Sequence, residues 1–128
     1  MCVSNDGTAG GVVQALEEQK LSGKVFVSGQ DADLAALQRI VAGTQSMTVY
    51  KPIKLLAPKA AEAAIALAKG EKLTTSATVN NGKIDVPSIL LEPLSVDKSN
   101  IAETVIKDGY QKMDEVYRAV PADQRPKL

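Results

Sequence analysis

The sequence predicts an α/β fold built on a parallel, doubly wound sheet. Three times in the first 70 residues, a short apolar stretch is followed by a polar turn and a helix-forming segment. Glycine or proline marks most borders between these segments, where helices end and turns begin. Strands and helices that alternate in this way form parallel sheets with right-handed crossovers.

The first strand-and-helix pair occupies about 20 residues. An extended stretch ends at Ser4, and Cys2 within it is expected to be a small buried side chain. A helix begins near Asp6 or Thr8, both good N-caps, and runs to about Lys20. The side chains predicted to form its inner face are Val12, Val13 and Leu16.

The second and third pairs follow the same order. Residues 25–28 predict a strand apolar enough to be buried on both faces. Asp31 or Asp33 caps the helix that follows. Residues 46–50 predict the third strand, and an alanine-rich helix over residues 52–69 is expected to pack tightly against a sheet. The predicted inner face of this last helix is Ile53, Leu56, Ala60, Ala64 and Ile65.

After the third helix the order of elements changes. Residues 73–79 and 83–86 predict a β-hairpin, because the Asn-Asn-Gly between them tolerates a tight turn. Prolines bracket an extended run at residues 88–91, which is typical of an edge strand or of a crossing between subdomains. A helix is predicted over residues 100–108, and a short helical piece over 112–118.

Composition excludes several classes of protein. Fifteen basic and fifteen acidic residues cancel and are interspersed, which does not favour a nucleic acid or an anionic membrane as partner. The sequence has no apolar run long enough for a membrane span, and no signal peptide precedes the first strand. A single cysteine and no histidine exclude an internal disulfide, the usual zinc sites and Ser-His or Cys-His nucleophile pairs. We expect no metal and no cofactor.

The glycine-rich turn at residues 7–11 is a weak candidate for phosphate binding. It joins a strand to a helix N-terminus, as phosphate-binding loops do. It lacks the Lys-Ser/Thr of a Walker loop and the Gly-x-Gly-x-x-Gly spacing of a dinucleotide fold. The sequence therefore does not favour a nucleotide site here.

Polar side chains follow all three predicted strands. Asn5 comes after the first strand, Asp31 after the second and Lys51 after the third. Open α/β sheets bind ligands beyond the carboxyl ends of their strands. An amide that donates and accepts, a carboxylate that accepts and an ammonium that donates together suit vicinal hydroxyl groups.

Each of these residues also has a simpler interpretation. Asn5 could be an ordinary turn residue, Asp31 only a helix cap, and Lys51 a solvated surface lysine. Lys51 stands near the N-terminus of a predicted helix, where the helix dipole repels an ammonium, which favours a functional role. Asp31 and Lys51 could alternatively form an acid/base or Schiff-base pair, as in an enzyme.

Three motifs resemble a known family. They are SNDGTAGG, the run SGQDADLAALQRIVAGTQSMTVYKPI, and TVNNGKIDVPSILLEP with the following VIKDGY. They closely resemble the C-terminal portion of the sugar-binding proteins of ABC transporters that share the type I periplasmic-binding-protein fold. The resemblance covers residues 1 to about 117, so nearly the whole chain. It implies that Asn5, Asp31 and Lys51 contact a sugar.

The resemblance also implies a division into two lobes that close over one sugar. Residues 1–46 would belong to the second, C-terminal lobe and residues 47–52 to a hinge crossing. Residues 53–87 would lie in the first lobe, and residues 88–118 would return to the second. Residues 119–128 are expected to form a disordered tail. Family members are more than twice as long, so the chain is expected to be a fragment.

The function implied is carbohydrate binding without catalysis. The ligand expected is a pentose, D-xylose above others, which an ABC permease would receive from the protein in the periplasm or at the cell surface. We expect the chain to need a complementary N-terminal portion or self-association, since exposed strand edges tend to pair. The alternative is a sugar sensor that acts on a signalling kinase. A repressor is not favoured, because no helix-turn-helix or basic face is present.

Overall fold

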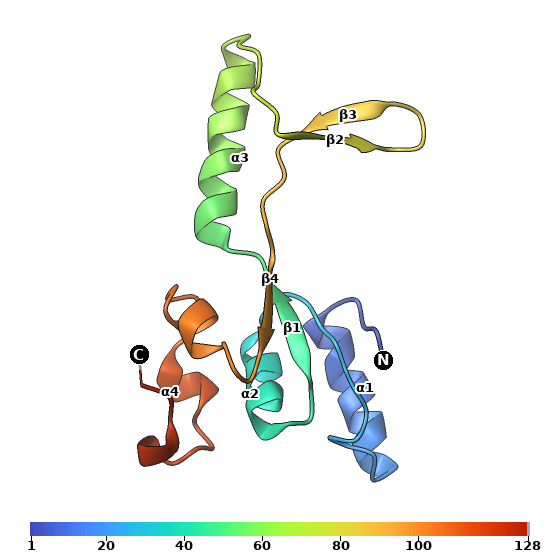
Figure 1. Cartoon of the computed structure of the whole chain (residues 1–128), viewed down its shortest axis with the longest axis vertical. Coiled ribbons are helices and arrows are strands. Elements are labelled where there is room, and N and C mark those ends of the chain that lie inside the picture. The colour runs from blue at the N-terminus through green and yellow to red at the C-terminus, as the bar shows by residue number, and fades with distance from the viewer. Residues whose placement is uncertain (128) are drawn as a thin grey trace. The chain divides into compact units, whose positions relative to one another are not determined.

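The computed structural model describes residues 1–127 and divides the chain into two compact units (Figure 1). Unit 1 consists of Met1–Tyr50 and the chain from Leu94 onward, and unit 2 is Lys51–Pro93. The chain thus leaves unit 1 after Tyr50 and returns at Leu94. The assignment of these units to the two lobes of a binding protein remains a prediction.

Unit 1 contains most of the helices. The helix α1 spans Asp6–Glu18 and α2 spans Leu34–Ala42, close to the bounds that the sequence predicts. The remaining helical elements of unit 1 are the π-helix η1 (Ala102–Ile106), α4 (Met113–Val116) and the 3-10 helix η2 (Ala122–Gln124). Capping residues explain where α1 begins and where α2 ends. The Asn5 side chain accepts the N–H of Thr8, and Gly43 ends α2 in the left-handed conformation.

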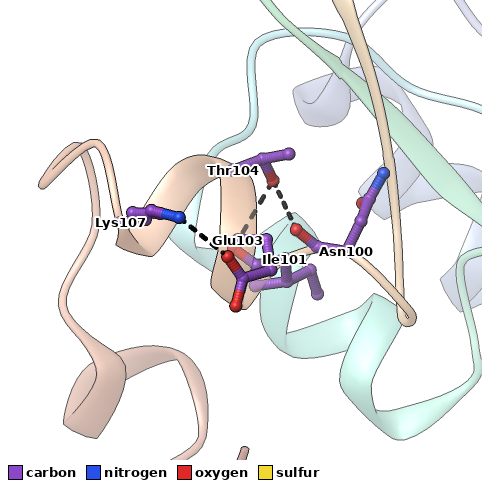
Figure 2. Close-up of polar contacts among 5 residues, drawn as sticks. All are labelled: Asn100, Ile101, Glu103, Thr104 and Lys107. Atoms are coloured by element: carbon purple, nitrogen blue, oxygen red, sulfur yellow. Dashed lines mark hydrogen bonds and ion pairs between the residues drawn. The ribbon is translucent and has the colours of Figure 1, made fainter. Parts of the chain in front are cut away.

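The π-helix η1 is held by side-chain bonds that Figure 2 shows. The hydroxyl of Thr104 donates to the carbonyl of Asn100 at 2.6 Å, and Lys107 pairs with Glu103 at 3.1 Å. A threonine hydroxyl that bonds a carbonyl one turn earlier is a common way to adjust helical geometry. The helix predicted over residues 100–108 is therefore present, in a wider form than an α-helix.

Two of the three predicted parallel strands are extended segments without regular strand pairing. Backbone bonds still join these segments, because Ser28 N–H donates to the Met1 carbonyl and Ser46 N–H donates to the Val27 carbonyl. Serine hydroxyls replace backbone partners between these bonds. Val3 N–H donates to Ser28 Oγ at 2.8 Å and Val27 N–H to Ser46 Oγ at 3.0 Å. The prediction of regular strands at residues 1–4 and 25–28 was wrong for this reason.

The third predicted strand is present as β1, Met47–Tyr50. It pairs with β4, Leu94–Asp97, in an antiparallel register in which Thr48 lies opposite Val96. The sequence pattern predicts an extended run at residues 88–91 and does not predict β4. The α/β alternation is correct, whereas the regular sheet of unit 1 consists of two antiparallel strands.

The core of unit 1 has two parts. The larger lies where α2, η1 and α4 pack on β1 and β4, and its most buried large side chains include Leu37, Ile40 and Tyr50. The smaller joins α1 to the extended segment through Ala9, Val13 and Val27. As predicted, Val13 faces inward.

Burial differs from prediction at two positions near the N-terminus. Cys2 is exposed, so the expectation of a buried cysteine was wrong. Phe26 is 63% exposed while its neighbour Val27 is fully buried. The segment at residues 25–28 is thus covered on one face and open on the other, and not buried on both faces.

The end of the described chain makes specific contacts. The Arg125 side chain pairs with Asp114 at 2.6 Å and donates to the Val120 carbonyl at 2.9 Å. The disorder expected for residues 119–128 remains a prediction. The last residue of that predicted tail, residue 128, lies outside the described residues.

Unit 2 consists of one helix and one hairpin. The helix α3 spans Ile53–Ala68, and β2 (Ala77–Asn80) pairs with β3 (Asp85–Ser88) as the predicted antiparallel hairpin. Gly82 adopts φ +89° in the connecting turn, which explains the glycine there. No residue of 51–93 is buried, so the inner face predicted for α3 is exposed within its own unit and does not pack tightly against a sheet there. None of the helices in residues 1–127 has the length and apolar character needed to cross a membrane.

Candidate functional site

Backbone bonds bring two of the three predicted strand ends together in unit 1. Asp6 N–H donates to the Gln30 carbonyl at 2.9 Å, and Asp31 N–H donates to the Val49 carbonyl at 2.8 Å. Asn5 and Asp31 therefore stand at neighbouring ends of the extended segments. We call this edge of unit 1, formed by residues 5–6, 30–33 and 48–49, the strand-end site.

Asn5 lies at the start of α1 with its side chain exposed. Its Oδ1 accepts the N–H of Thr8 at 2.9 Å, so Asn5 is the N-cap of the helix. The capping role does not exclude contact with a ligand, because the carboxamide also has an NH2 group with two donors.

Asp31 lies in a strained backbone turn. Asp31 has φ +104° and the next residue, Ala32, has φ +55°, and neither is a glycine. A residue in such a backbone conformation raises the free energy of the folded chain by on the order of 1–3 kcal/mol. Residues strained in this way are common at functional sites. Asp33, rather than Asp31, occupies the N-cap position of α2, where its side chain makes no capping bond.

The 31–33 turn, formed by Asp31, Ala32 and Asp33, is held on both sides of its backbone. Its three N–H groups donate to the Val49 carbonyl (2.8 Å), to Thr48 Oγ1 (3.2 Å) and to Asp6 Oδ2 (3.0 Å). Its first two carbonyls accept from the Tyr110 hydroxyl (3.3 Å) and from Gln111 Nε2 (3.4 Å). Surrounding bonds thus stabilise a turn that is unfavourable by itself.

A buried carboxylate lies beneath this turn. Asp6 is 1% exposed and accepts from Gln45 Nε2 at 2.9 Å, from the Thr48 hydroxyl at 2.9 Å and from the Asp33 N–H at 3.0 Å. Arg39 completes the network through Gln45 Oε1 and the Asp6 carbonyl. A buried charge requires such partners, because leaving it unpaired is costly.

Sequence reasoning missed this network. It treated Asp6 only as a possible helix cap and did not single out Gln45 or Thr48. The bonds join residues 27 to 42 positions apart, which no local pattern predicts. The available signals were a glutamine just before the third strand, a threonine within it, and Gly29. A Cβ on Gly29 would overlap the Asp6 carboxylate and the Gln45 amide.

Neighbouring charges change the pKa of one acidic group of the turn, Asp33. Asp33 is exposed, and partial desolvation of its carboxyl raises the pKa, which the neighbouring carboxylates of Asp6 and Asp31 raise further. The guanidinium of Arg39 acts in the opposite direction and has a smaller effect.

Two tyrosine rings that pack together, Tyr50 and Tyr110, lie next to the 31–33 turn. Tyr50 is 2% exposed, and its hydroxyl donates to Asp108. Burial, followed by this hydrogen bond, raises the pKa of Tyr50 well above its ordinary value. The Tyr110 ring packs on Tyr50 with centroids 4.9 Å apart, which places the Tyr110 hydroxyl near the Asp31 carbonyl.

Lys51, the third predicted site residue, belongs to unit 2. It is partly buried and lines an apolar groove with Pro52, Leu55 and the segment 89–93. By chain connectivity it stands two residues after Val49, the partner of Asp31 N–H. Its contact with a ligand shared with Asn5 and Asp31 remains a prediction.

The groups at the strand-end site suit a polar, uncharged ligand. Asp31 supplies acceptors and Asn5 supplies both donors and acceptors, which are the partners that hydroxyl groups need. Within residues 1–127, no cluster of three or more histidine, cysteine or acidic side chains could hold a metal ion.

Comparison with known proteins decides the family. The family profile described as "Periplasmic binding protein domain" matches residues 1–72. The chain belongs to the periplasmic binding proteins. The chain is 61% identical to the D-xylose-binding periplasmic proteins of Haemophilus influenzae, over 114 residues, and of Escherichia coli, over 113 residues. These matches cover 89% and 88% of the chain and 34% of each relative.

A solved structure supports the same family. The chain is similar to a carbohydrate transporter solute-binding protein from Chloroflexus aurantiacus in complex with D-glucose, with a TM-score of 0.79 and 38% identity. The match covers 89% of the chain and 34% of that protein. The chain therefore has part of the type I periplasmic-binding-protein fold and spans about a third of the length of the relatives that it matches.

Proposed function

We propose that the chain is the C-terminal part of a solute-binding protein that binds a pentose, D-xylose in the first place, and delivers it to an ABC permease. The observation that supports this most directly is the 61% identity to two D-xylose-binding periplasmic proteins. The proposal includes a periplasmic location, reversible binding and no catalysis.

The strand-end site supplies the chemistry. In this proposal the Asp31 carboxylate accepts hydrogen bonds from sugar hydroxyls, and the Asn5 NH2 group donates while its Oδ1 continues to cap α1. Lys51 donates from the crossing into unit 2. Charge-assisted bonds to hydroxyls are the strong contacts of such a site.

These three residues are too few to bind a sugar alone. Three hydrogen bonds at roughly 1.5–3 kcal/mol each give about 5–9 kcal/mol, whereas association costs an estimated 4–15 kcal/mol. Micromolar affinity requires about −8 kcal/mol net. The proposal therefore includes further contacts from the part of the polypeptide that the chain does not span.

Unit 2 offers a surface for that remaining part. Its apolar side chains have no core of their own, and one groove is lined by Leu56, Leu73, Ile89 and Leu91. The relatives are about three times as long as the matched region, so we propose the remaining two thirds of the same polypeptide as the occupant. Burial of apolar surface would supply the stability of that contact.

Calorimetric titration with D-xylose tests the proposed function. One sample is the chain alone. The other is the complemented protein, in which the chain is co-expressed with the part of the Haemophilus influenzae relative that it does not span. We expect micromolar or tighter binding by the complemented protein and no measurable binding by the chain alone. Absence of binding in both samples would contradict the proposal, and heat from turnover would indicate an enzyme.

A further inference from the structure

The buried hydroxyl of Thr48 occupies a central place beneath the 31–33 turn. Thr48 is fully buried in β1, and its Oγ1 lies 2.9 and 3.0 Å from the two carboxylate oxygens of Asp6. The same oxygen accepts the N–H of Ala32 at 3.2 Å. One hydroxyl thus donates to a buried carboxylate and accepts from the backbone of the strained turn.

The position of this hydroxyl matters because the turn is unfavourable without support. Asp31 and Ala32 both have positive φ, and Asp31 carries the carboxylate of the proposed sugar contact. The neighbouring bonds of the turn go to the Val49 carbonyl and to Asp6 Oδ2, so Thr48 is the middle of three consecutive partners. Loss of this hydroxyl would leave a buried N–H without its acceptor and a buried carboxylate without one of its donors.

We propose that Thr48 is a positioning residue for sugar recognition, which holds the Asp31 carboxylate in place through the Ala32 amide. This inference rests on the proposed function. Thr48 does not contact the ligand, because it is completely buried under the turn. It acts by fixing the direction in which Asp31 leaves the backbone, and a displaced carboxylate forms weaker bonds to a sugar hydroxyl.

A set of threonine variants tests this role in the complemented protein. Thr48→Val keeps the shape of the side chain and removes the hydroxyl, whereas Thr48→Ser restores the hydroxyl. Thr104→Val is the matched control, because the Thr104 hydroxyl also donates a hydrogen bond within unit 1, to the Asn100 carbonyl, but belongs to η1 (Figure 2). We expect Thr48→Val to weaken D-xylose affinity by about tenfold or more, and Thr48→Ser and Thr104→Val to stay within about twofold.

A double-mutant cycle separates positioning from general loss of stability. If Thr48 acts through Asp31, Thr48→Val will cause little further loss of affinity in an Asp31→Ala background. Equal losses in both backgrounds would overturn the inference. Titrations are run well below the melting temperature of every variant, so that unfolding does not contribute to the affinity.

Hydrogen exchange provides a second readout that needs no ligand. In the chain itself, we expect the amides of Ala32 and Asp33 to be protected and to exchange faster in Thr48→Val, with no such change in Thr104→Val. Unchanged exchange in Thr48→Val, or faster exchange without loss of affinity, would overturn the inference and leave the proposed function intact. If exchange is faster in Thr48→Val but the unsubstituted complemented protein binds no sugar, the proposed function is contradicted and, with it, the assignment of Thr48 to sugar recognition.

Discussion

Gly29 lies against the most buried carboxylate of the strand-end site. An added Cβ would overlap both Asp6 Oδ1 and Gln45 Nε2, and neither group can move without losing hydrogen bonds. By contrast, Gly11 lies within α1, and a Cβ there would meet nothing within 4 Å. The two glycines therefore differ in what a methyl group would encounter.

We predict opposite effects of one substitution at these two positions. Gly29→Ala should lower the free energy of unfolding by about 1–3 kcal/mol, because the buried network must shift. Gly11→Ala should raise it by about 0.5–1 kcal/mol, because alanine favours a helix. Urea denaturation of both variants measures the difference. Equal effects would mean that the Gly29 backbone does not approach the network closely.

Asp33 gives the site a pH dependence with a definite sign. Its pKa is raised by partial desolvation and by Asp6 and Asp31, so the folded chain holds the Asp33 proton more tightly than the unfolded chain does. Stability contributed by this group is therefore present at low pH and decreases as pH rises above the ordinary carboxyl pKa. Asp97 behaves in the opposite way, because hydrogen bonds from the Ser99 side chain and backbone lower its pKa.

Amide substitution at these two positions should reveal the difference. Asp33→Asn should raise the melting temperature at pH 7, because it removes a carboxylate that Asp6 and Asp31 repel, and the gain should shrink as the pH falls toward 3 and Asp33 becomes protonated. Asp97→Asn should lower the melting temperature at pH 7, with a loss that shrinks at low pH. Thermal unfolding followed by circular dichroism between pH 3 and 7 measures both trends. A destabilising Asp33→Asn at pH 7 would contradict the account.

The individual residues of the candidate site were partly predictable from the sequence. Asn5 and Asp31 follow apolar segments, and the structure places them at neighbouring ends, as that pattern predicts. Asp6, Gln45 and Thr48 were not predictable, because polar pairs distant in sequence have no periodic signature. The strained φ of Asp31 also has no sequence signal, since aspartate is not a residue that requires it.

Among the elements, helices were easier to predict than strands. The bounds of α1, α2 and α3 follow from caps and from apolar spacing that lie within each segment. Strands depend on partners far along the chain. Serine hydroxyls interrupt the pairing of the first two extended segments, and β4 pairs with β1 across more than forty residues. Neither arrangement can be read from a local window.

The open face of α3 leads to a prediction about association. Leu56 lines two grooves of unit 2 and is 46% exposed, whereas Ala61 of the same helix is exposed and lines neither. Leu56→Asp should weaken binding of the chain to its complementary portion by about tenfold or more, because a charge would be buried in the contact. Ala61→Asp adds the same charge and should have a much smaller effect.

Size-exclusion chromatography with light scattering of the co-expressed parts measures this association. Equal weakening by both variants would show that charge alone is responsible. An undiminished complex with Leu56→Asp would show that the groove is not the contact.

For the whole molecule, the sequence motifs predicted the family and the α/β fold, and both are confirmed. The chain spans about a third of the length of these relatives, and we propose that the other two thirds cover the apolar surface that unit 2 exposes. Local sequence does not mark the division after Tyr50, because Val49 and Lys51 belong to one continuous motif, whereas prolines stand close to the division before Leu94.

The central claim is that Asn5 and Asp31 of the strand-end site, together with Lys51 of unit 2, contact the sugar. Isothermal titration of D-xylose into the complemented protein, with single alanine variants of the three residues, tests it most directly. We expect Asp31→Ala to weaken binding by about 10- to 100-fold, as loss of a charged hydrogen bond does, with smaller losses for Asn5→Ala and Lys51→Ala. The control, Asp123→Ala in the exposed η2, should bind as the unsubstituted protein does. Unchanged affinity in Asp31→Ala would contradict the claim.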